Sequence, residues 1–178
     1  VVTSVSTTTA DGAYKEGQVI AITVTFDKAV TVTDTPQLTL ETGSNDAVVD
    51  YVSGSGTTML TFNYTVASGQ NSDDLDYADT TSLALNGGTI TETGGTAPAS
   101  LILPTPGATN SLGANKALVV DGIVPTVSSV TSTTSNGSYK VDEVIAITVT
   151  FSEAVTVNTT DGTPQLTLET GSSDAVVN

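Results

Sequence analysis

The sequence predicts an all-β protein, and three observations carry that prediction. First, Thr and Val account for 35 and 23 of the 178 residues, and β-branched side chains favour pleated strands over helices. Second, apolar and polar residues alternate with a period of two in several segments, which is the pattern of a strand with one buried face. Third, Gly and Asn separate these segments at the spacing of turns in antiparallel sheets.

This alternation predicts where the individual strands lie. The clearest alternating sets are Ile20, Ile22, Val24 and Phe26; Leu60, Phe62, Tyr64 and Val66; and Ile145, Ile147, Val149 and Phe151. These side chains are expected to form the core between two packed sheets. Further strands are expected at Val2–Thr8, Gln37–Glu41, Ala47–Val52, Leu75–Tyr77, Gly88–Glu92, Ser100–Leu103 and Ala117–Asp121. Short strands at this spacing indicate an antiparallel immunoglobulin-like β-sandwich.

One aromatic residue has a specific structural assignment. The segment from Asp74 to Tyr77 has the D-x-x-Y spacing of a tyrosine corner. In that motif the phenol hydroxyl donates a hydrogen bond to the backbone of a loop. Tyr77 is therefore expected to have a structural role.

The sequence also repeats itself at long range. The segment Val2–Phe26 (VTSVSTTTADGAYKEGQVIAITVTF) returns 125 residues later as Val127–Phe151 (VSSVTSTTSNGSYKVDEVIAITVTF). A second segment, TPQLTLETGSNDAVVD, ends at Asp50 and returns 128 residues later, ending at Asn178. The additional residues around 158–162 mark a loop. A period of this size is typical of a folded domain in tandem rather than of a solenoid unit.

The repeat sets the expected domain organisation. We expect a complete immunoglobulin-like repeat over residues 1–121, a linker over 122–125 and the N-terminal part of a second repeat over 126–178. The second repeat lacks strands needed to cover its apolar face. Three explanations are open: the sequence stops at Asn178 without structural meaning, a second chain adds the strands, or this part is locally disordered. Expected partners are neighbouring repeats of the same chain and, through strand addition, other copies.

Composition excludes several classes of function. The chain has 19 Asp and Glu against 4 Lys, a formal net charge of -15, and no Arg, His or Cys. A Ser-His-Asp triad, a disulfide framework and the usual zinc sites are therefore excluded. The negative charge disfavours nucleic acid and anionic membrane surfaces, and no apolar run reaches the ~18 residues of a membrane helix. A charged partner is expected to be a cation.

The order of motifs along the chain resembles a known family. The strings DGAYKEGQVIAITVTFDKAVTV, TPQLTLETG, LDYADTTSLALNGGTI and SLGANKALVVDGIVPTV are similar to the repeated bacterial Ig-like domains of very large secreted surface proteins. These include RTX-type adhesins and a cyanobacterial swimming-associated repeat. The resemblance covers nearly the whole chain. It implies an extracellular location, at the bacterial cell surface or secreted, and a role as an extender or adhesive stalk, often with calcium between domains.

The acidic residues suggest where calcium would bind. If each strand reverses direction, the first, third and fifth loops and the end of the last strand meet at one pole of the domain. Crowded carboxylates repel unless a cation lies among them, and Ca²⁺ takes six to eight oxygen ligands from such loops. The loop 152–154 is expected to face this pole across Pro125. The candidate ligands are Asp11, Glu16, Asp73, Asp74, Asp76, Asp121 and Glu153. The alternative is a solvated acidic surface that keeps the protein soluble.

Catalysis is not expected. A glycosidase needs only two carboxylates, but the chain has no Trp and few aromatic platforms for sugars. The sequence therefore predicts a calcium-stiffened stalk or filament module. A binding module that contacts a glycan or protein through Thr93–Pro98 or Thr105–Asn115 is the competing class.

Overall fold

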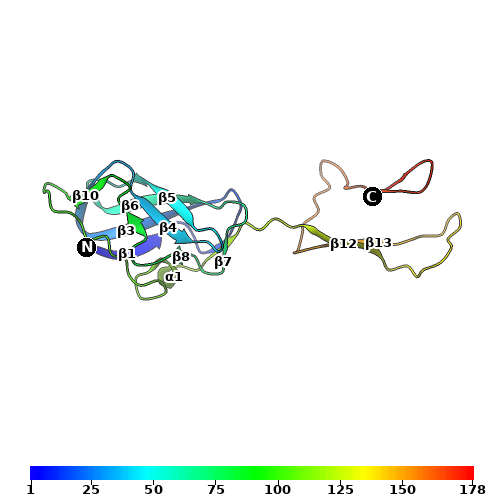
Figure 1. Cartoon of the computed structure of the whole chain (residues 1–178), viewed down its shortest axis with the longest axis horizontal. Coiled ribbons are helices and arrows are strands. Elements are labelled where there is room, and N and C mark those ends of the chain that lie inside the picture. The colour runs from blue at the N-terminus through cyan, green and yellow to red at the C-terminus, as the bar shows by residue number, and fades with distance from the viewer. The chain divides into compact units, whose positions relative to one another are not determined.

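The computed structural model describes all 178 residues and divides them into two compact units (Figure 1). Unit 1 is Val1–Val124 and unit 2 is Pro125–Asn178. Almost all regular structure is β, with a single helix of four residues, α1 (Leu112–Asn115). The all-β prediction is confirmed.

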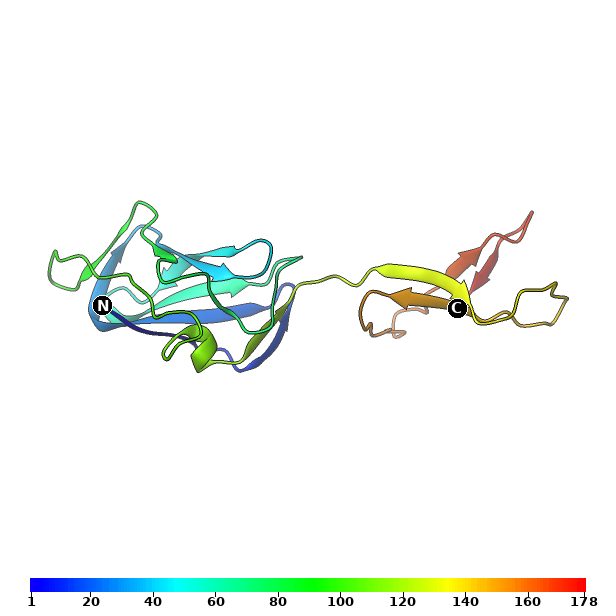
Figure 2. The same cartoon turned by 60° about the horizontal axis from the view of Figure 1, so that its bottom comes forward.

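Unit 1 contains eleven strands, several of them very short (Figure 2). Their bounds are β1 (Val2–Thr7), β2 (Gly12–Lys15), β3 (Val19–Thr33), β4 (Gln37–Glu41), β5 (Ala47–Ser53), β6 (Thr57–Thr65), β7 (Asn71–Ser72), β8 (Asp76–Tyr77), β9 (Leu83–Ala84), β10 (Thr89–Glu92) and β11 (Leu118–Asp121).

Most of these strands form one antiparallel sheet that curls on itself. Its order is β1-β3-β6-β5-β4-β8, with β10 added to β3 and β9 added to β4. The curl is located in β5, which changes partner along its length. Residues 47–50 pair with β4 in the register Leu40↔Ala47, whereas Tyr51 pairs with Phe62 of β6. The two layers expected as separate sheets are therefore continuous through β5.

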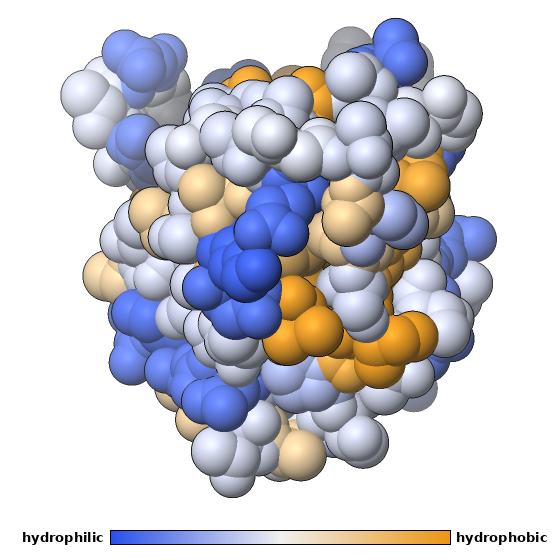
Figure 3. Space-filling model, turned by 90° about the vertical axis from the view of Figure 1, so that its left-hand side faces the viewer, coloured by the Kyte–Doolittle hydropathy of each residue, from blue (hydrophilic) through white to orange (hydrophobic).

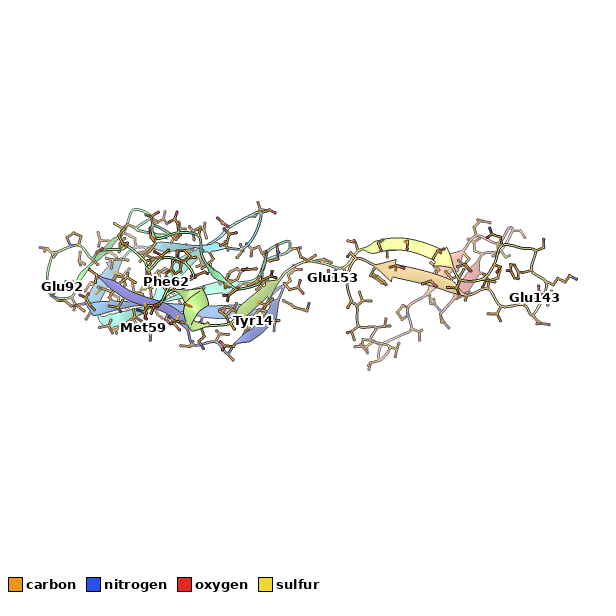
Figure 4. The ribbon with its side chains drawn as sticks, turned by 90° about the horizontal axis from the view of Figure 1, so that it is seen from below. Tyr14, Met59, Phe62, Glu92, Glu143 and Glu153 are labelled. Atoms are coloured by element: carbon orange, nitrogen blue, oxygen red, sulfur yellow. The ribbon has the colours of Figure 1, made fainter.

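The core lies inside this curl and contains the residues that the alternation predicts for unit 1. The prediction is wrong for the equivalent set in unit 2, where Ile145, Val149 and Phe151 are exposed. Ile20, Ile22 and Val24 of β3 are fully buried and pair across the sheet with the buried residues of β6. Phe62 lies inside unit 1 (Figure 4), with its ring centroid 6.1 Å from that of Tyr51 in an edge-to-face arrangement. Packing against aliphatic and aromatic side chains therefore holds the sheet closed.

Two strand predictions differ from the structure. Ser100–Leu103 is not a strand, because Pro98 and Pro104 flank it without backbone N–H groups and Leu103 N donates only to Thr80 O, at 2.9 Å. β3 extends to Thr33, seven residues past the predicted core set, because its second half pairs with β10 from Thr33↔Thr89 to Val30↔Glu92.

A second sheet, β2-β11-β7, closes one side of unit 1. β11, the predicted final strand, pairs parallel to β2 in the register Leu118↔Gly12 and antiparallel to β7 in the register Val120↔Ser72. The prediction of purely antiparallel pairing is therefore wrong for β2. This small sheet places the loops before β2 and after β7 on either side of β11.

The structural role predicted for Tyr77 is confirmed, because its hydroxyl donates to the carbonyl oxygen of Pro104 at 2.5 Å. The partner lies 27 residues further along the chain. A second buried phenol, that of Tyr64, donates to Gln70 Oε1 at 2.9 Å. Burial raises the pKa of Tyr64 to about 12. Burial, and to a smaller extent the Asp76 carboxylate, raises the pKa of Tyr77 above its ordinary value.

Unit 1 should therefore unfold in alkali. The neutral phenols are favoured in the folded state, so their contribution to stability is fully present below the unfolded pKa of about 10 and is lost as pH rises toward about 12. Phenolate absorbance and far-UV circular dichroism should change together above about pH 10. Full phenolate absorbance in a chain that keeps its β signal would contradict the burial of these two hydroxyls.

Unit 2 consists of two hairpins that reproduce parts of unit 1. They are β12 (Val127–Ser132) with β13 (Ile147–Phe151), and β14 (Leu166–Leu168) with β15 (Ala175–Val177). Val127 pairs with Phe151 as Val2 pairs with Phe26, and the same irregularity in register follows each pair. The pairs of β14 with β15 match those of β4 with β5. Sequence repetition is thus accompanied by repetition of strand register.

Candidate functional site

Three of the predicted calcium ligands line one open pocket of about 360 Å³ in unit 1. Asp11 precedes β2, and Asp73 and Asp74 follow β7, so pairing of both strands with β11 brings the three acids near α1. All three residues are exposed. Lys116 lines the same pocket, with its Nζ 3.7 Å from Asp11 Oδ1 and 3.3 Å from the carbonyl oxygen of Thr9.

A short helix forms the wall of this pocket. Ser111 caps it, because its hydroxyl oxygen accepts a hydrogen bond from Ala114 N at 3.2 Å. Gly113 lies against the acids: a Cβ atom there would be 3.1 Å from Asp76 Oδ2 and 3.3 Å from Asp74 Oδ2. The absence of a side chain at this position gives the two carboxylates their space.

Asp76 has a structural role in unit 1. It is only 9% exposed, its Oδ1 accepts from Tyr77 N at 2.9 Å, and its Oδ2 accepts from Gly107 N at 3.0 Å. These bonds fix the loop around Gly107 beside Tyr77. Both carboxylate oxygens are therefore already in use within the protein.

Asp121 and Glu16 lie at the other end of the small sheet. Lys15 Nζ donates to Asp121 Oδ2 at 2.6 Å, and this hydrogen bond lowers the pKa of the Asp121 carboxyl. Glu16 is exposed in the turn after β2. Gly12 of β2 pairs with Leu118 of β11, and Asp121 lies three residues further along β11. That separation is roughly 10 Å along the strand. The acids expected at one pole are thus separated into two groups.

Glu153 belongs to unit 2 and lies at the end of β13 that is next to the linker (Figure 4). The neighbouring Ser152 holds that end, because its N donates to Thr126 O at 2.8 Å and its Oγ accepts from Thr126 N at 2.9 Å. The Oε1 of Glu153 is buried and has no hydrogen-bond partner. In unit 1 the equivalent residue is Lys28, whose Nζ contacts Glu92 Oε1 at 2.8 Å.

This geometry offers calcium no ready-made set of ligands. Nowhere in the chain do three or more acidic residues converge closely enough to hold a metal ion. Lysines engage Asp11 and Asp121, and backbone N–H groups engage Asp76. Among the predicted ligands, Glu16, Asp73 and Asp74 of unit 1 are exposed, and the buried Oε1 of Glu153 in unit 2 has no hydrogen-bond partner. Calcium therefore stays a prediction.

The segment 122–125, expected to be a linker, is held by hydrogen bonds at its first residue. Gly122 N donates to Gln70 O at 2.8 Å, and Gly122 O accepts from Gly69 N at 2.8 Å. A Cβ atom on Gly122 would lie 2.3 Å from Ala67 O. Glycine is needed at this position because two backbone segments approach each other closely. Gln70 is in turn bonded to the buried Tyr64, so the anchor connects to the core.

The sequence does not predict this anchor, because residues 67–70 show no alternation of apolar and polar side chains. The division between units falls after Val124, and Ile123 and Val124 are about half exposed. Pro125 then begins unit 2 with a fixed φ angle.

The end of unit 1 that carries the N-terminus and β10 has an apolar area among hydrophilic side chains (Figure 3). A shallow pocket of about 250 Å³ lies at this end, lined by Val30, Pro98 and Ala99 together with the Lys28–Glu92 ion pair.

The chain was also compared with known proteins. No family model, curated protein or solved structure matches it. None of its helices is long and apolar enough to cross a membrane.

Proposed function

We propose that the chain is a tandem segment of immunoglobulin-like β-sandwich repeats that works as a structural spacer in a bacterial surface or secreted protein. The observation that supports this most is the shared register of the hairpins: β12–β13 repeats β1–β3, and β14–β15 repeats β4–β5. A domain that recurs in series has the form of an extender. No catalytic residue belongs to this proposal.

Three further features agree with a spacer. Gly122 is bonded to the loop 67–70, so the segment between units leaves unit 1 from a fixed point. Pro125 restricts the backbone where unit 2 begins. The net charge of -15 keeps neighbouring chains apart, as a soluble extracellular array requires.

Small-angle X-ray scattering tests the spacer directly. Chains with one, two and four copies of residues 1–125 in series should gain a nearly constant increment of maximum dimension with each copy. A flexible string would instead grow about as the square root of the number of copies. Increments that shrink with copy number would contradict a spacer of fixed geometry.

Calcium is part of the proposal as a ligand of the pocket lined by Asp11, Asp73 and Asp74. Lys116 is the one positively charged side chain that lines this pocket beside the three carboxylates. When bound there, Ca²⁺ would balance their remaining negative charge. Asp73 and Asp74 would provide the principal oxygen ligands, and Gly113 would leave room for them.

Calorimetric titration with CaCl₂, paired with thermal melts in calcium and in EGTA, tests this ion. Binding should raise the melting temperature, because a ligand held only by the folded state stabilises it. Asp74→Asn should weaken binding, whereas Lys116→Met should strengthen it by removing a competing cation. Absence of heat and of a melting shift in all three proteins would reject calcium and leave the acids as surface charge.

A further inference from the structure

The first and last residues of unit 1 lie at opposite ends of its sheets. The N-terminus is at one end of unit 1, and the chain leaves unit 1 at Val124 from the other end (Figure 1). β1 and β2 follow each other from the first end, and β11 ends at Asp121, next to the second. β2 and β11 are parallel. Tension between the two ends of unit 1 therefore pulls β2 and β11 in opposite directions along their own axes.

β2 and β11 meet in a parallel seam, which consists of residues 12–15 and residues 118–121. Gly12 N donates to Ala117 O at 3.0 Å, and the pairing continues along both strands to the pair of Lys15 with Asp121. The hydrogen bonds of a parallel pair are evenly spaced along the strands. Tension along the strands therefore loads these bonds together, whereas a force that opens the seam from one end breaks them one after another.

β11 is fixed to the rest of unit 1 along its other edge. Leu75 N donates to Leu118 O at 2.8 Å, and Gly122 N donates to Gln70 O at 2.8 Å. Leu118 and Val120 are buried in the core. β2, in contrast, pairs with β11 alone. The seam is thus the backbone contact that must break before β2 can leave unit 1.

β1 takes up tension before the seam does. It pairs antiparallel with β3, and on its other edge Val5 N donates to Asn110 O at 2.9 Å. When these contacts break, the tension passes through residues 8–11 to β2. β2 then stays attached through the seam and through Tyr14, which packs against the core.

The lysines of unit 1 are concentrated at this seam. The chain has four Lys and no Arg. Lys15 Nζ lies 2.6 Å from Asp121 Oδ2 at one end of the seam, and Lys116 Nζ lies 3.7 Å from Asp11 Oδ1 just beyond the other end. Moving β2 along β11 by one residue displaces these partners by about 3.3 Å. Both ion pairs therefore oppose the sliding motion that tension produces.

We infer that unit 1 carries tension and that the β2–β11 seam sets its resistance to being pulled open. This inference rests on the proposed spacer role, because domains connected in series transmit tension along the chain. It also goes beyond that role, since a spacer of fixed geometry can still open under a small force. Scattering tests the spacer role, whereas pulling on single molecules tests the seam.

Optical-tweezer measurements on the full chain in two pulling directions test the inference. The chain has no Cys, so introduced pairs of cysteines can carry the handles. Val1→Cys with Val124→Cys loads the seam along its strands, whereas Glu16→Cys with Val124→Cys opens it from one end. All three positions are exposed. At equal force, folded unit 1 should survive at least about tenfold longer in the first direction, because several hydrogen bonds must break together.

Urea midpoints show whether the two cysteine pairs leave unit 1 equally stable, so that only the direction of force differs between them. With equal midpoints, equal survival times in the two pulling directions would overturn the inference.

Two lysine variants provide a second, matched test. Lys15→Met removes the ion pair with Asp121 at the seam, and Lys28→Met removes the exposed ion pair with Glu92, which joins β3 to β10 away from the seam. Under tension along the strands, Lys15→Met should shorten survival about threefold, as expected for an exposed ion pair. Lys28→Met should leave survival unchanged. Equal effects of the two variants would contradict a seam that sets the resistance.

Discussion

Replacing Phe26 with alanine should lower the free energy of unfolding of unit 1 by about 3 to 5 kcal/mol. The same substitution at Phe151, its equivalent in unit 2, should cost less than about 1 kcal/mol. Phe26 is 2% exposed within the closed core, and truncation leaves a cavity there, whereas Phe151 is 37% exposed. Identical local sequence and hairpin register make the pair a controlled comparison of burial.

Urea unfolding followed by tyrosine fluorescence reports on unit 1, because four of the five tyrosines lie there. Amide hydrogen exchange at β12 and β13 reports on unit 2. The midpoint of the fluorescence transition should fall markedly for Phe26→Ala and stay unchanged for Phe151→Ala. Equal losses of protection in the two hairpins would mean that Phe151 is buried as deeply as Phe26.

Replacing Gly122 with alanine should destabilise unit 1 by about 1 to 3 kcal/mol, because the new Cβ overpacks a close backbone contact. It would lie 2.3 Å from Ala67 O and 2.8 Å from Gln70 O, so the two hydrogen bonds of Gly122 cannot persist unchanged. The segment leading to unit 2 should also become more mobile, since its anchor is lost.

Gly95→Ala is the matched control for this substitution. A Cβ on Gly95 meets only ordinary contacts, the nearest at 3.6 Å from Glu92 O, so its effect should be within about 0.5 kcal/mol. Urea midpoints measure the stability difference, and amide exchange of residues 67–70 measures the anchor. Similar stability in the two variants would show that the Gly122 contact does not hold the end of unit 1.

The alternation of apolar residues was sufficient to locate the central strands. Ile20, Ile22 and Val24 face the core as expected, because a period of two leaves no other face for them. The same signal could not show that β5 changes partner between Asp50 and Tyr51. That change depends on twist and on contacts far apart in sequence, which no local pattern records.

The pairing of the shortest strands could not be predicted from the sequence either. β7 and β9 have two residues each, too few for any periodicity, and β2 contains only Gly12, Ala13, Tyr14 and Lys15. The parallel pairing of β2 with β11 joins segments that are far apart in the sequence, so the local composition does not predict it.

Only some of the acids expected at one pole line the same pocket. Asp11, Asp73 and Asp74 line it without converging on one point, whereas Asp121 is bound by Lys15 further along β11. The prediction assigned loops to poles from strand direction alone. Strand direction alone could not show that β2 pairs parallel with β11, which places Asp11 near α1 and Asp121 at the opposite end of that pair.

The central claim is that residues after Pro125 begin a second copy of the fold of unit 1, and one extended chain tests it most directly. Adding a second copy of Tyr51–Val124 after Asn178 supplies the continuation that the 128-residue offset assigns. In this chain, Phe151→Ala should become as costly as Phe26→Ala, about 3 to 5 kcal/mol, because a new β6 would cover β13. A cost that stays below about 1 kcal/mol would contradict the claim.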